Sequence, residues 1–228
     1  MSEIQSSHPA LSGVVLAGGF STRFGDEDKA IADLAGKPLI GYVVDALLEI
    51  TDTIVVNCRA DQREEIEAAL EGELPERAAL EFAVDPVPDR GPVAGIRTGL
   101  EAVDHEYAAV VACDMPFCSP VLLELLAERA GGRDGAIVRL ADGWFQPTQA
   151  VYRTDAMAGA CADVLDSGGG RILRAIEAID CVVLEEGDQA LSTLAPETLS
   201  RTFESVDTRT ELEQAARRLE QGERFDSE

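Results

Sequence analysis

Short apolar runs bounded by turn-forming residues recur along the first two-thirds of the chain and alternate with segments of helical periodicity. Runs of this length without polar alternation are typical of strands buried on both faces of a parallel sheet. The pattern therefore predicts strands at 13–17, 53–58, 80–84, 107–112, 136–140, 149–152, 181–184 and 203–206.

The segments between these strands carry apolar residues three or four positions apart, as amphipathic helices do. Pro38, Pro92 and Pro120 stand where a first helical turn would begin, and Asp61 and Ser119 are residue types that cap helices. The predicted helices cover 38–50, 61–70, 92–103, 120–130, 154–165, 171–178 and a final segment that begins near 208.

This alternation of strands and helices predicts an α/β fold, a three-layer α/β/α sandwich around a Rossmann-like, mostly parallel sheet. A chain of 228 residues requires no second domain, and no internal repeat or linker divides it. We expect one domain at 13–220, a loose polar tail at 1–12 and an acidic tail at 221–228.

The charge balance narrows the range of partners. The formal net charge is -24, from 43 acidic and 19 basic residues, and only two of the bases are lysines, Lys29 and Lys37. A negative field of this size repels nucleic acids and anionic membranes, so we expect neither as a partner. Scarce lysine with excess acid resembles haloarchaeal proteins, although the same balance also fits an ordinary acidic protein.

Other features of the composition indicate a soluble cytoplasmic protein. Five cysteines without a C-x-x-C pair favour free thiols in a reducing compartment. Two histidines argue against a histidine-ligated zinc site. No apolar run reaches membrane-spanning length, and no signal-peptide pattern opens the chain.

A glycine-rich loop follows the first predicted strand and carries candidate phosphate-binding groups. Gly18 and Gly19 leave the main chain open to a ligand, and Arg23, Gly25 and Lys29 follow. Backbone donors combined with fixed cations favour an anion such as a phosphate chain. The spacing matches neither a Walker A loop nor the dinucleotide fingerprint, and glycine spacing alone would also fit an ordinary turn.

Polar residues stand at the ends of three further predicted strands, namely Asn57, Asp85 and Asp114. The carboxyl ends of parallel strands share one edge, and ligands bind in the crevice beside that edge. Asp114 is a candidate ligand for Mg²⁺, which prefers oxygen atoms, although a turn or helix cap would also explain a carboxylate there. Asp85 and Asn57 have similar alternatives as a turn former and a strand-end cap.

The sequence from Leu16 to Lys29 resembles the L-A-G-G-x-x-x-R-[MF]-G-x-x-K signature of nucleotidyltransferases, and within them the molybdenum cofactor guanylyltransferases. The segments 34–39 and 91–96 are similar to that family too, and Cys113-Asp114-Met115-Pro116 matches its C-D-x-P motif. Phe24 replaces the commoner methionine. The resemblance spans about 13–216 and is strongest before Pro116.

The resemblance implies transfer of GMP from GTP to the phosphate of molybdenum-molybdopterin, with Mg²⁺ as cofactor and pyrophosphate as the second product. It gives Arg23, Lys29 and Asp114 the catalytic roles, the first two at the phosphates and the third at the metal. It also implies nucleotide contacts from Leu16, Ala17, Gly18, Gly19, Asn57 and Asp85. We expect a monomer or weak homo-oligomer with transient contacts to molybdenum cofactor enzymes or chaperones.

Related activities stay open at this point. The nucleotide could be CTP, or the acceptor of GTP could be cobinamide phosphate or a lactyl phosphate. A catalytically silent nucleotide-binding regulator is a further alternative.

Five other sites along the chain have roles that stay open at this point. Arg90 and Arg97 either touch phosphates or pair with surface acids, and Gly168–Gly170 is an anion site or a hinge. The segment 144–148 resembles the family's segment that faces the second substrate. The segment 205–212 resembles the family's closing N-[VI]-[ND]-T-x-x-[ED]-L motif, with Ser205 in place of the first asparagine.

The acidity yields a first prediction. Molar potassium chloride should raise the melting temperature relative to dilute buffer, because salt screens the repulsion within a net charge of -24. Thermal melts across a salt series test this, and no gain between low and molar salt would contradict a high-salt habitat.

Overall fold

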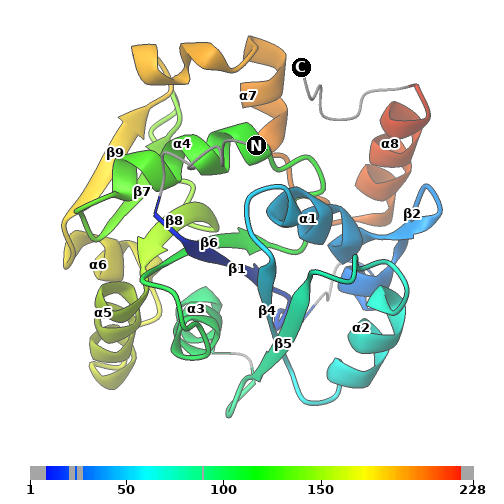
Figure 1. The fold of residues 1–228 in the computed structure, drawn as a ribbon, viewed down its shortest axis with the longest axis horizontal. Helices are drawn as coiled ribbons and strands as arrows, with labels where there is room; N and C mark the ends of the chain where they lie inside the picture. Colours follow the sequence, from blue (N-terminus) through cyan, green and yellow to red (C-terminus); the bar gives the residue numbers. More distant parts are fainter. Residues whose placement is uncertain (1–8, 21–23, 25–27, 89, 222–228) are drawn as a thin grey trace, which may run out of the picture.

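In the computed structural model, which describes residues 9–20, 24, 28–88 and 90–221, seven strands form the central sheet. They are β1 (Leu11–Leu16), β4 (Thr53–Cys58), β5 (Ala79–Val84), β6 (Tyr107–Ala112), β7 (Gly135–Arg139), β8 (Gln149–Arg153) and β9 (Cys181–Glu185). Their order is β5-β4-β1-β6-β8-β7-β9, and β8 runs antiparallel to both of its neighbours (Figure 1).

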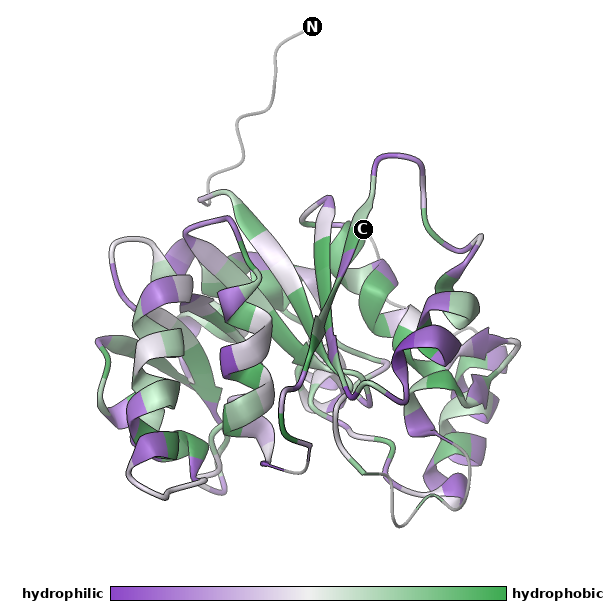
Figure 2. Ribbon diagram, turned by 90° about the horizontal axis from the view of Figure 1, so that it is seen from below, coloured by the Kyte–Doolittle hydropathy of each residue, from purple (hydrophilic) through white to green (hydrophobic). Residues whose placement is uncertain are grey.

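Two apolar cores lie on opposite faces of this sheet. The first packs α1 (Leu39–Leu48), α2 (Arg63–Leu70), α4 (Pro120–Ala130) and α7 (Pro196–Thr202) against one face. The second packs α3 (Pro92–Glu101), α5 (Thr154–Asp166) and α6 (Ile172–Glu177) against the other. Figure 2 shows hydrophobic colour through the sheet and hydrophilic colour on outward helix turns. The predicted three-layer α/β/α sandwich is confirmed.

A third, smaller core packs α8 (Arg209–Glu220) against α1 and the hairpin of β2 (Asp33–Leu34) and β3 (Lys37–Pro38). Two short 3₁₀ helices complete the description, η1 (Lys29–Ile31) and η2 (Gln189–Thr193). Within the described ranges, no helix is long and apolar enough to cross a membrane.

The four strands β5, β4, β1 and β6 are mutually parallel, so their carboxyl ends lie at one edge of the sheet. Leu16 is in register with Asn57 on one side and with Ala112 on the other. The chain adds β4 and β5 on one side of β1 and then crosses to place β6 on the other side. This reversal is the topological switch point at which open α/β sheets bind ligands.

The C-terminal third departs most from the sequence-based expectation. The strand predicted at 203–206 is wrong, because Val206 makes one backbone hydrogen bond to Asp114 O, at 2.8 Å, and pairs with no strand. Val206 instead packs in the core beneath α8, and Phe203 packs against the first core. The short helices α7 and η2 and the β2–β3 hairpin were not predicted, because such short elements carry too few residues to show a period.

Several predicted boundaries differ from the observed ones by one or two residues, and two of these differences have a clear cause. Leu11 and Ser12 are buried and belong to β1, so the strand starts within the segment expected as a loose tail. Helix α2 starts at Arg63 with Gln62 as its N-cap, and no side chain caps it. Asp61 does not cap that helix because its carboxylate accepts hydrogen bonds from Arg59, at 3.2 and 3.4 Å.

Helix α3 lies unusually close to β1. A Cβ atom added at Gly99 would lie 2.6 Å from Cγ1 of Val14, a separation that real Cβ atoms do not show. The glycine therefore sets the distance between α3 and the sheet, and with it the position of the segment that opens α3 beside the carboxyl edge.

Two glycine substitutions separate packing from helix propensity. Alanine in place of an interior helical glycine gains about 1 kcal/mol from propensity, so Gly159→Ala, whose Cβ meets no atom within 4 Å, should stabilise the protein. Gly99→Ala gains the same amount but should lose about 1–3 kcal/mol through overpacking, for a net destabilisation. Denaturant unfolding of the two variants checks this, and equal stabilities would disprove the packing constraint.

Candidate active site

A pocket of about 220 Å³ lies at the carboxyl edge, beside the switch point between β1 and β6. Residues from five parts of the chain line it, namely Leu16, Gly18, Gly19, Asn57, Asp85, Arg90, Gly91, Pro92, Gly95, Ala112 and Thr148. The structure therefore brings together most of the residues for which the sequence predicted nucleotide contacts.

Asn57 and Asp85 form a fixed polar pair at one wall of this pocket. The Asn57 side chain is buried, and its Nδ2 donates hydrogen bonds to Asp85 Oδ1 at 2.8 Å and Ala83 O at 3.2 Å. The register of β4 against β5 pairs Asn57 with Ala83, and Asp85 follows directly after β5. The amide nitrogen is therefore committed to protein, and one carboxylate oxygen of Asp85 is oriented by it.

Two glycines keep this wall accessible. A Cβ at Gly18 would lie 2.5 Å from Asp85 Oδ2, and a Cβ at Gly95 would lie 2.5 Å from Asn57 Oδ1. Neither position tolerates a side chain without displacing the polar pair. Because these glycines have no side chain, the main chain lies close to Asn57 and Asp85. The side-chain oxygens of the pair and the backbone of the glycines therefore face the same pocket.

Lys29 and Asp114 meet at the other end of the site, beyond Ala112. Lys29 projects from η1, and its Nζ lies 2.7 Å from Asp114 Oδ2 and 2.9 Å from Asp207 Oδ1. Ser205 Oγ donates a hydrogen bond to the second oxygen of Asp207, at 3.0 Å. The ammonium of Lys29 thus bridges one carboxylate from the middle of the chain and one from its C-terminal part.

The charge state of this cluster follows from its contacts. Burial opposes the positive charge of Lys29, but the attraction of Asp114 and hydrogen bonds to Asp114 and Asp207 outweigh it and raise the Lys29 pKa. Burial and the charge of Asp114 raise the pKa of the adjacent Cys113 thiol. The cluster therefore holds a protonated amine and a neutral thiol, and Cys113 is no candidate nucleophile.

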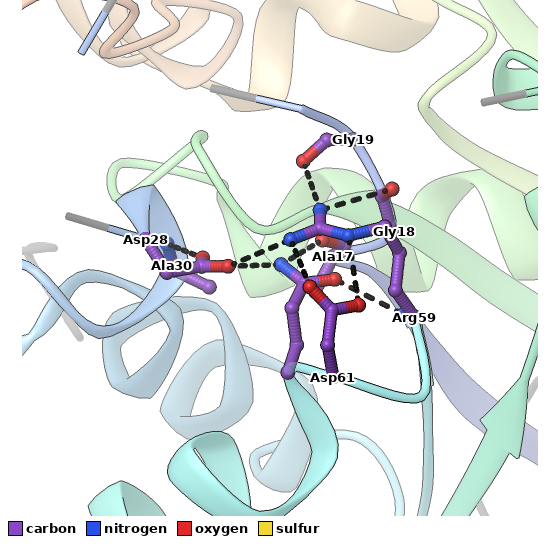
Figure 3. Close-up of polar contacts among 8 residues, drawn as sticks. Ala17, Gly18, Gly19, Asp28, Ala30, Arg59 and Asp61 are labelled. Atoms are coloured by element: carbon purple, nitrogen blue, oxygen red, sulfur yellow. Dashed lines mark hydrogen bonds and ion pairs between the residues drawn. The ribbon is translucent and has the colours of Figure 1, made fainter. Parts of the chain in front are cut away.

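The polar loop between β1 and η1 is anchored from two sides. Arg209 at the start of α8 donates from Nε to Phe24 O at 3.2 Å, and Phe24 itself is buried. From the other side, Arg59 donates a hydrogen bond to Gly19 O (Figure 3). Gln62 contacts Ala17 and Asp28.

Sequence reasoning missed Arg59, Gln62 and Asp207. The available signal was position: Arg59 and Gln62 follow β4 at the same edge as the predicted site, and Asp207 lies in a segment that resembled the family.

The remaining predicted residues have varied placements. Arg23 lies outside the described residues, as do its two preceding neighbours. Arg90 lines the pocket, whereas Arg97 pairs with Glu101 on the surface of α3 at 2.7 Å. In the segment 144–148, Thr148 lines the pocket and Trp144 is exposed.

Gly168–Gly170 joins α5 to α6 and contributes nothing to the pocket lining. Among the residues that the structure describes, no cluster of three or more His, Cys, Asp or Glu side chains is arranged to hold a metal. Asp114 and Asp207 are the carboxylates available beside Lys29.

Comparisons with known proteins agree with the nucleotidyltransferase resemblance of the sequence. Residues 13–182 match the model of a family described as the MobA-like NTP transferase domain. A protein named probable molybdenum cofactor guanylyltransferase, from the haloarchaeon Natronomonas pharaonis, is 49% identical over 208 residues, which are 91% of this chain and 98% of that protein. One of the same name from Methanosarcina mazei is 31% identical over 202 residues, 89% of this chain and 88% of its own.

Solved structures share the fold. Molybdopterin-guanine dinucleotide biosynthesis protein A from Archaeoglobus fulgidus superposes with a TM-score of 0.72 at 24% identity, over 92% of this chain and all of that one. A 4-diphosphocytidyl-2C-methyl-D-erythritol synthase from Anaerococcus prevotii gives 0.68 at 13% identity, over 96% of this chain and 100% of that one. With the match over 13–182, these results show that the chain belongs to the MobA-like NTP transferase family and, within it, to the molybdenum cofactor guanylyltransferases.

Proposed function

We propose that this nucleotidyltransferase moves GMP from GTP to the terminal phosphate of molybdenum-molybdopterin and releases pyrophosphate. A phosphate oxygen of the acceptor attacks the α-phosphorus of GTP, and the bond from that phosphorus to the pyrophosphate oxygen breaks. The observation that carries the proposal is the convergence of the pocket with the Lys29–Asp114–Asp207 cluster at one sheet edge.

The nucleophile in this reaction needs no general base, because a phosphate group is already ionised near neutral pH. The site agrees with this requirement: its charged groups are carboxylates, the Lys29 ammonium and the Arg90 guanidinium, and His105, the histidine within the described residues, does not line the pocket. Rate enhancement then comes from alignment of the two phosphates and neutralisation of their charge.

The pocket provides the groups that would hold the nucleoside. The backbone edge at Leu16, the oriented carboxylate of Asp85 and the open face of Gly95 surround it. Backbone groups and an acidic acceptor suit a base with several hydrogen-bonding edges, and guanine offers N–H donors to a carboxylate. The family membership supports GTP over CTP.

Lys29 is the residue that we assign to the phosphate chain. Its ammonium is positively charged, largely buried and attached to the turn that ends the glycine-rich loop. In the described part of the chain it compensates two carboxylates, and phosphate oxygens are acceptors of the same kind.

The residues at this end also fit Mg²⁺. Magnesium is usually held by one or two carboxylates together with substrate phosphates and water, and Asp114 and Asp207 supply such a pair. Asp114 would hold the ion, with Asp207 beside it. The bound ion would supply positive charge at the reacting phosphate oxygens.

We further propose that the enzyme works in the cytoplasm as a monomer or weak homo-oligomer. The five cysteines are free thiols, which suits a reducing compartment, and transient contacts with molybdenum cofactor enzymes or chaperones would deliver the product.

The direct test is incubation with GTP, CTP and metal-loaded molybdopterin in separate combinations, with pyrophosphate release as the measurement. Release that requires both GTP and molybdopterin supports the proposal. Release with CTP, or with cobinamide phosphate or a lactyl phosphate as acceptor, would replace it by the corresponding reaction, and release from none of them would favour a regulator.

Asp114→Asn should keep the fold and lower turnover about 1,000-fold or more, because an amide lacks the charge that positions a divalent cation at the phosphates. Asp52→Asn is the matched control, since Asp52 is an exposed carboxylate paired with Arg77. Pyrophosphate release at the wild-type rate from Asp114→Asn would refute the metal assignment.

Lys29→Ala should weaken GTP binding and lower kcat/KM by ~10- to 100-fold, the cost of one hydrogen bond to a charged group. Lys29→Arg should recover part of this, since a planar fork does not replace a compact ammonium between two carboxylates. Lys37→Arg is the control, because Lys37 pairs with Asp45 and Glu73 near the surface and should tolerate the change. Full activity of Lys29→Arg would move the phosphate assignment to Arg23.

A further inference from the structure

The side chain of Arg59 reaches from the end of β4 back to the glycine-rich loop and is almost completely buried, with 9% of it exposed. Its Nη1 donates hydrogen bonds to Gly19 O at 2.8 Å and to Gly18 O at 3.4 Å. Figure 3 shows the guanidinium between these carbonyls and the carboxylates of Asp28 and Asp61.

Gln62 holds the loop residue that precedes the two glycines, Ala17. Its Nε2 donates to Ala17 O at 3.1 Å and to Asp28 Oδ2, and its Oε1 accepts a hydrogen bond from Arg59 N at 3.0 Å. Three consecutive carbonyls, those of Ala17, Gly18 and Gly19, are therefore held by two neighbouring side chains.

This arrangement fixes the direction of the loop amides. In a trans peptide the N–H of one residue points opposite to the carbonyl of the residue before it. The N–H groups of Gly18, Gly19 and Phe20 are thus directed away from Gln62 and Arg59. Across the described residues none of these three N–H groups donates a hydrogen bond to protein, and Gly18 and Gly19 line the pocket.

The network also holds the far end of the loop. Asp28 Oδ1 accepts a hydrogen bond from Ala30 N at 2.9 Å and so caps η1, the turn that carries Lys29. Asp28 Oδ2 contacts Gln62 and lies 3.5 Å from Arg59 Nη2. Arg59 and Gln62 therefore fix the position of the loop amides relative to η1, the turn from which the Lys29 side chain projects.

Arg59 itself is not placed to bind a phosphate. Nε and Nη2 contact Asp61, Nη1 is directed at the loop carbonyls, and the Phe20 ring covers the guanidinium at 4.3 Å. We propose that Arg59 and Gln62 are positioning residues, which present the amides of Gly18, Gly19 and Phe20 and the ammonium of Lys29 to the nucleotide phosphates. This inference rests on the proposed use of a nucleoside triphosphate.

Three variants of the full chain test the proposal: Arg59→Ala, Arg59→Lys and Gln62→Met, the last of similar length but without hydrogen-bond donors. The affinities for GTP and for guanosine are measured, together with kcat, KM and the melting temperature. Arg63→Ala is the matched control, because Arg63 is a half-exposed arginine of the same segment that pairs with Glu67 and does not touch the loop.

Arg59→Ala and Gln62→Met should weaken GTP binding and raise KM by ~10- to 100-fold, as expected for lost hydrogen bonds to and from ordered polar groups, while guanosine binding stays unchanged. Arg59→Lys should have a melting temperature near that of the wild type. Its GTP affinity should lie between those of Arg59→Ala and the wild type, since one ammonium cannot reach both carbonyls and both carboxylates. Arg63→Ala should leave all values near those of the wild type.

Three outcomes would overturn the proposal. In the first, Arg59→Lys or Gln62→Met binds GTP as tightly as the wild type does. In the second, GTP and guanosine affinities fall equally in a variant with a lowered melting temperature, which would indicate a structural role only. In the third, the wild type itself binds no nucleoside triphosphate, and the proposed function then fails as well.

Discussion

The parallel pairing of β4, β1 and β6 is the constraint on which the site depends. Because the three strands run in one direction, their carboxyl ends open on the same edge, and the polar groups that follow them must find partners there. Asn57 bonds Asp85, Asp114 bonds Lys29, and the loop carbonyls bond Arg59 and Gln62. Most of these polar groups therefore form hydrogen bonds with one another, and the loop N–H groups that do not are left for a ligand.

The charged groups at the carboxyl edge of the sheet also pair with one another. In a chain with a net charge of -24, two carboxylates lie beside one ammonium, and their attraction and hydrogen bonds outweigh the effect of burial and keep it charged. Substrates that carry several negative charges must enter this environment, so fixed cations and backbone N–H groups have to offset the repulsion locally. Conversion of Lys29 or Arg59 to a neutral side chain therefore affects more than a single contact.

The sequence predicted the sheet, most of its helices and the pocket because each depends on local information. Apolar runs mark buried strands, and the polar residues after them, Asn57, Asp85 and Asp114, identify the shared edge. The role of Asp207 was hidden, since it lies 178 positions from Lys29 and follows a segment that looked like a strand. Arg59 and Gln62 were missed because their partners are loop carbonyls, which leave no trace in side-chain patterns.

The late position of Asp207 has a consequence for synthesis. All seven strands of the central sheet are complete in sequence by Glu185, and the family match ends at residue 182. Asp207 and Arg209, which contact Lys29 and the loop carbonyl of Phe24, leave the ribosome afterwards. Since domains are synthesised from the N-terminus onward, the growing chain can assemble its scaffold before its charged cluster, and the complete site forms only after residue 209 has been synthesised.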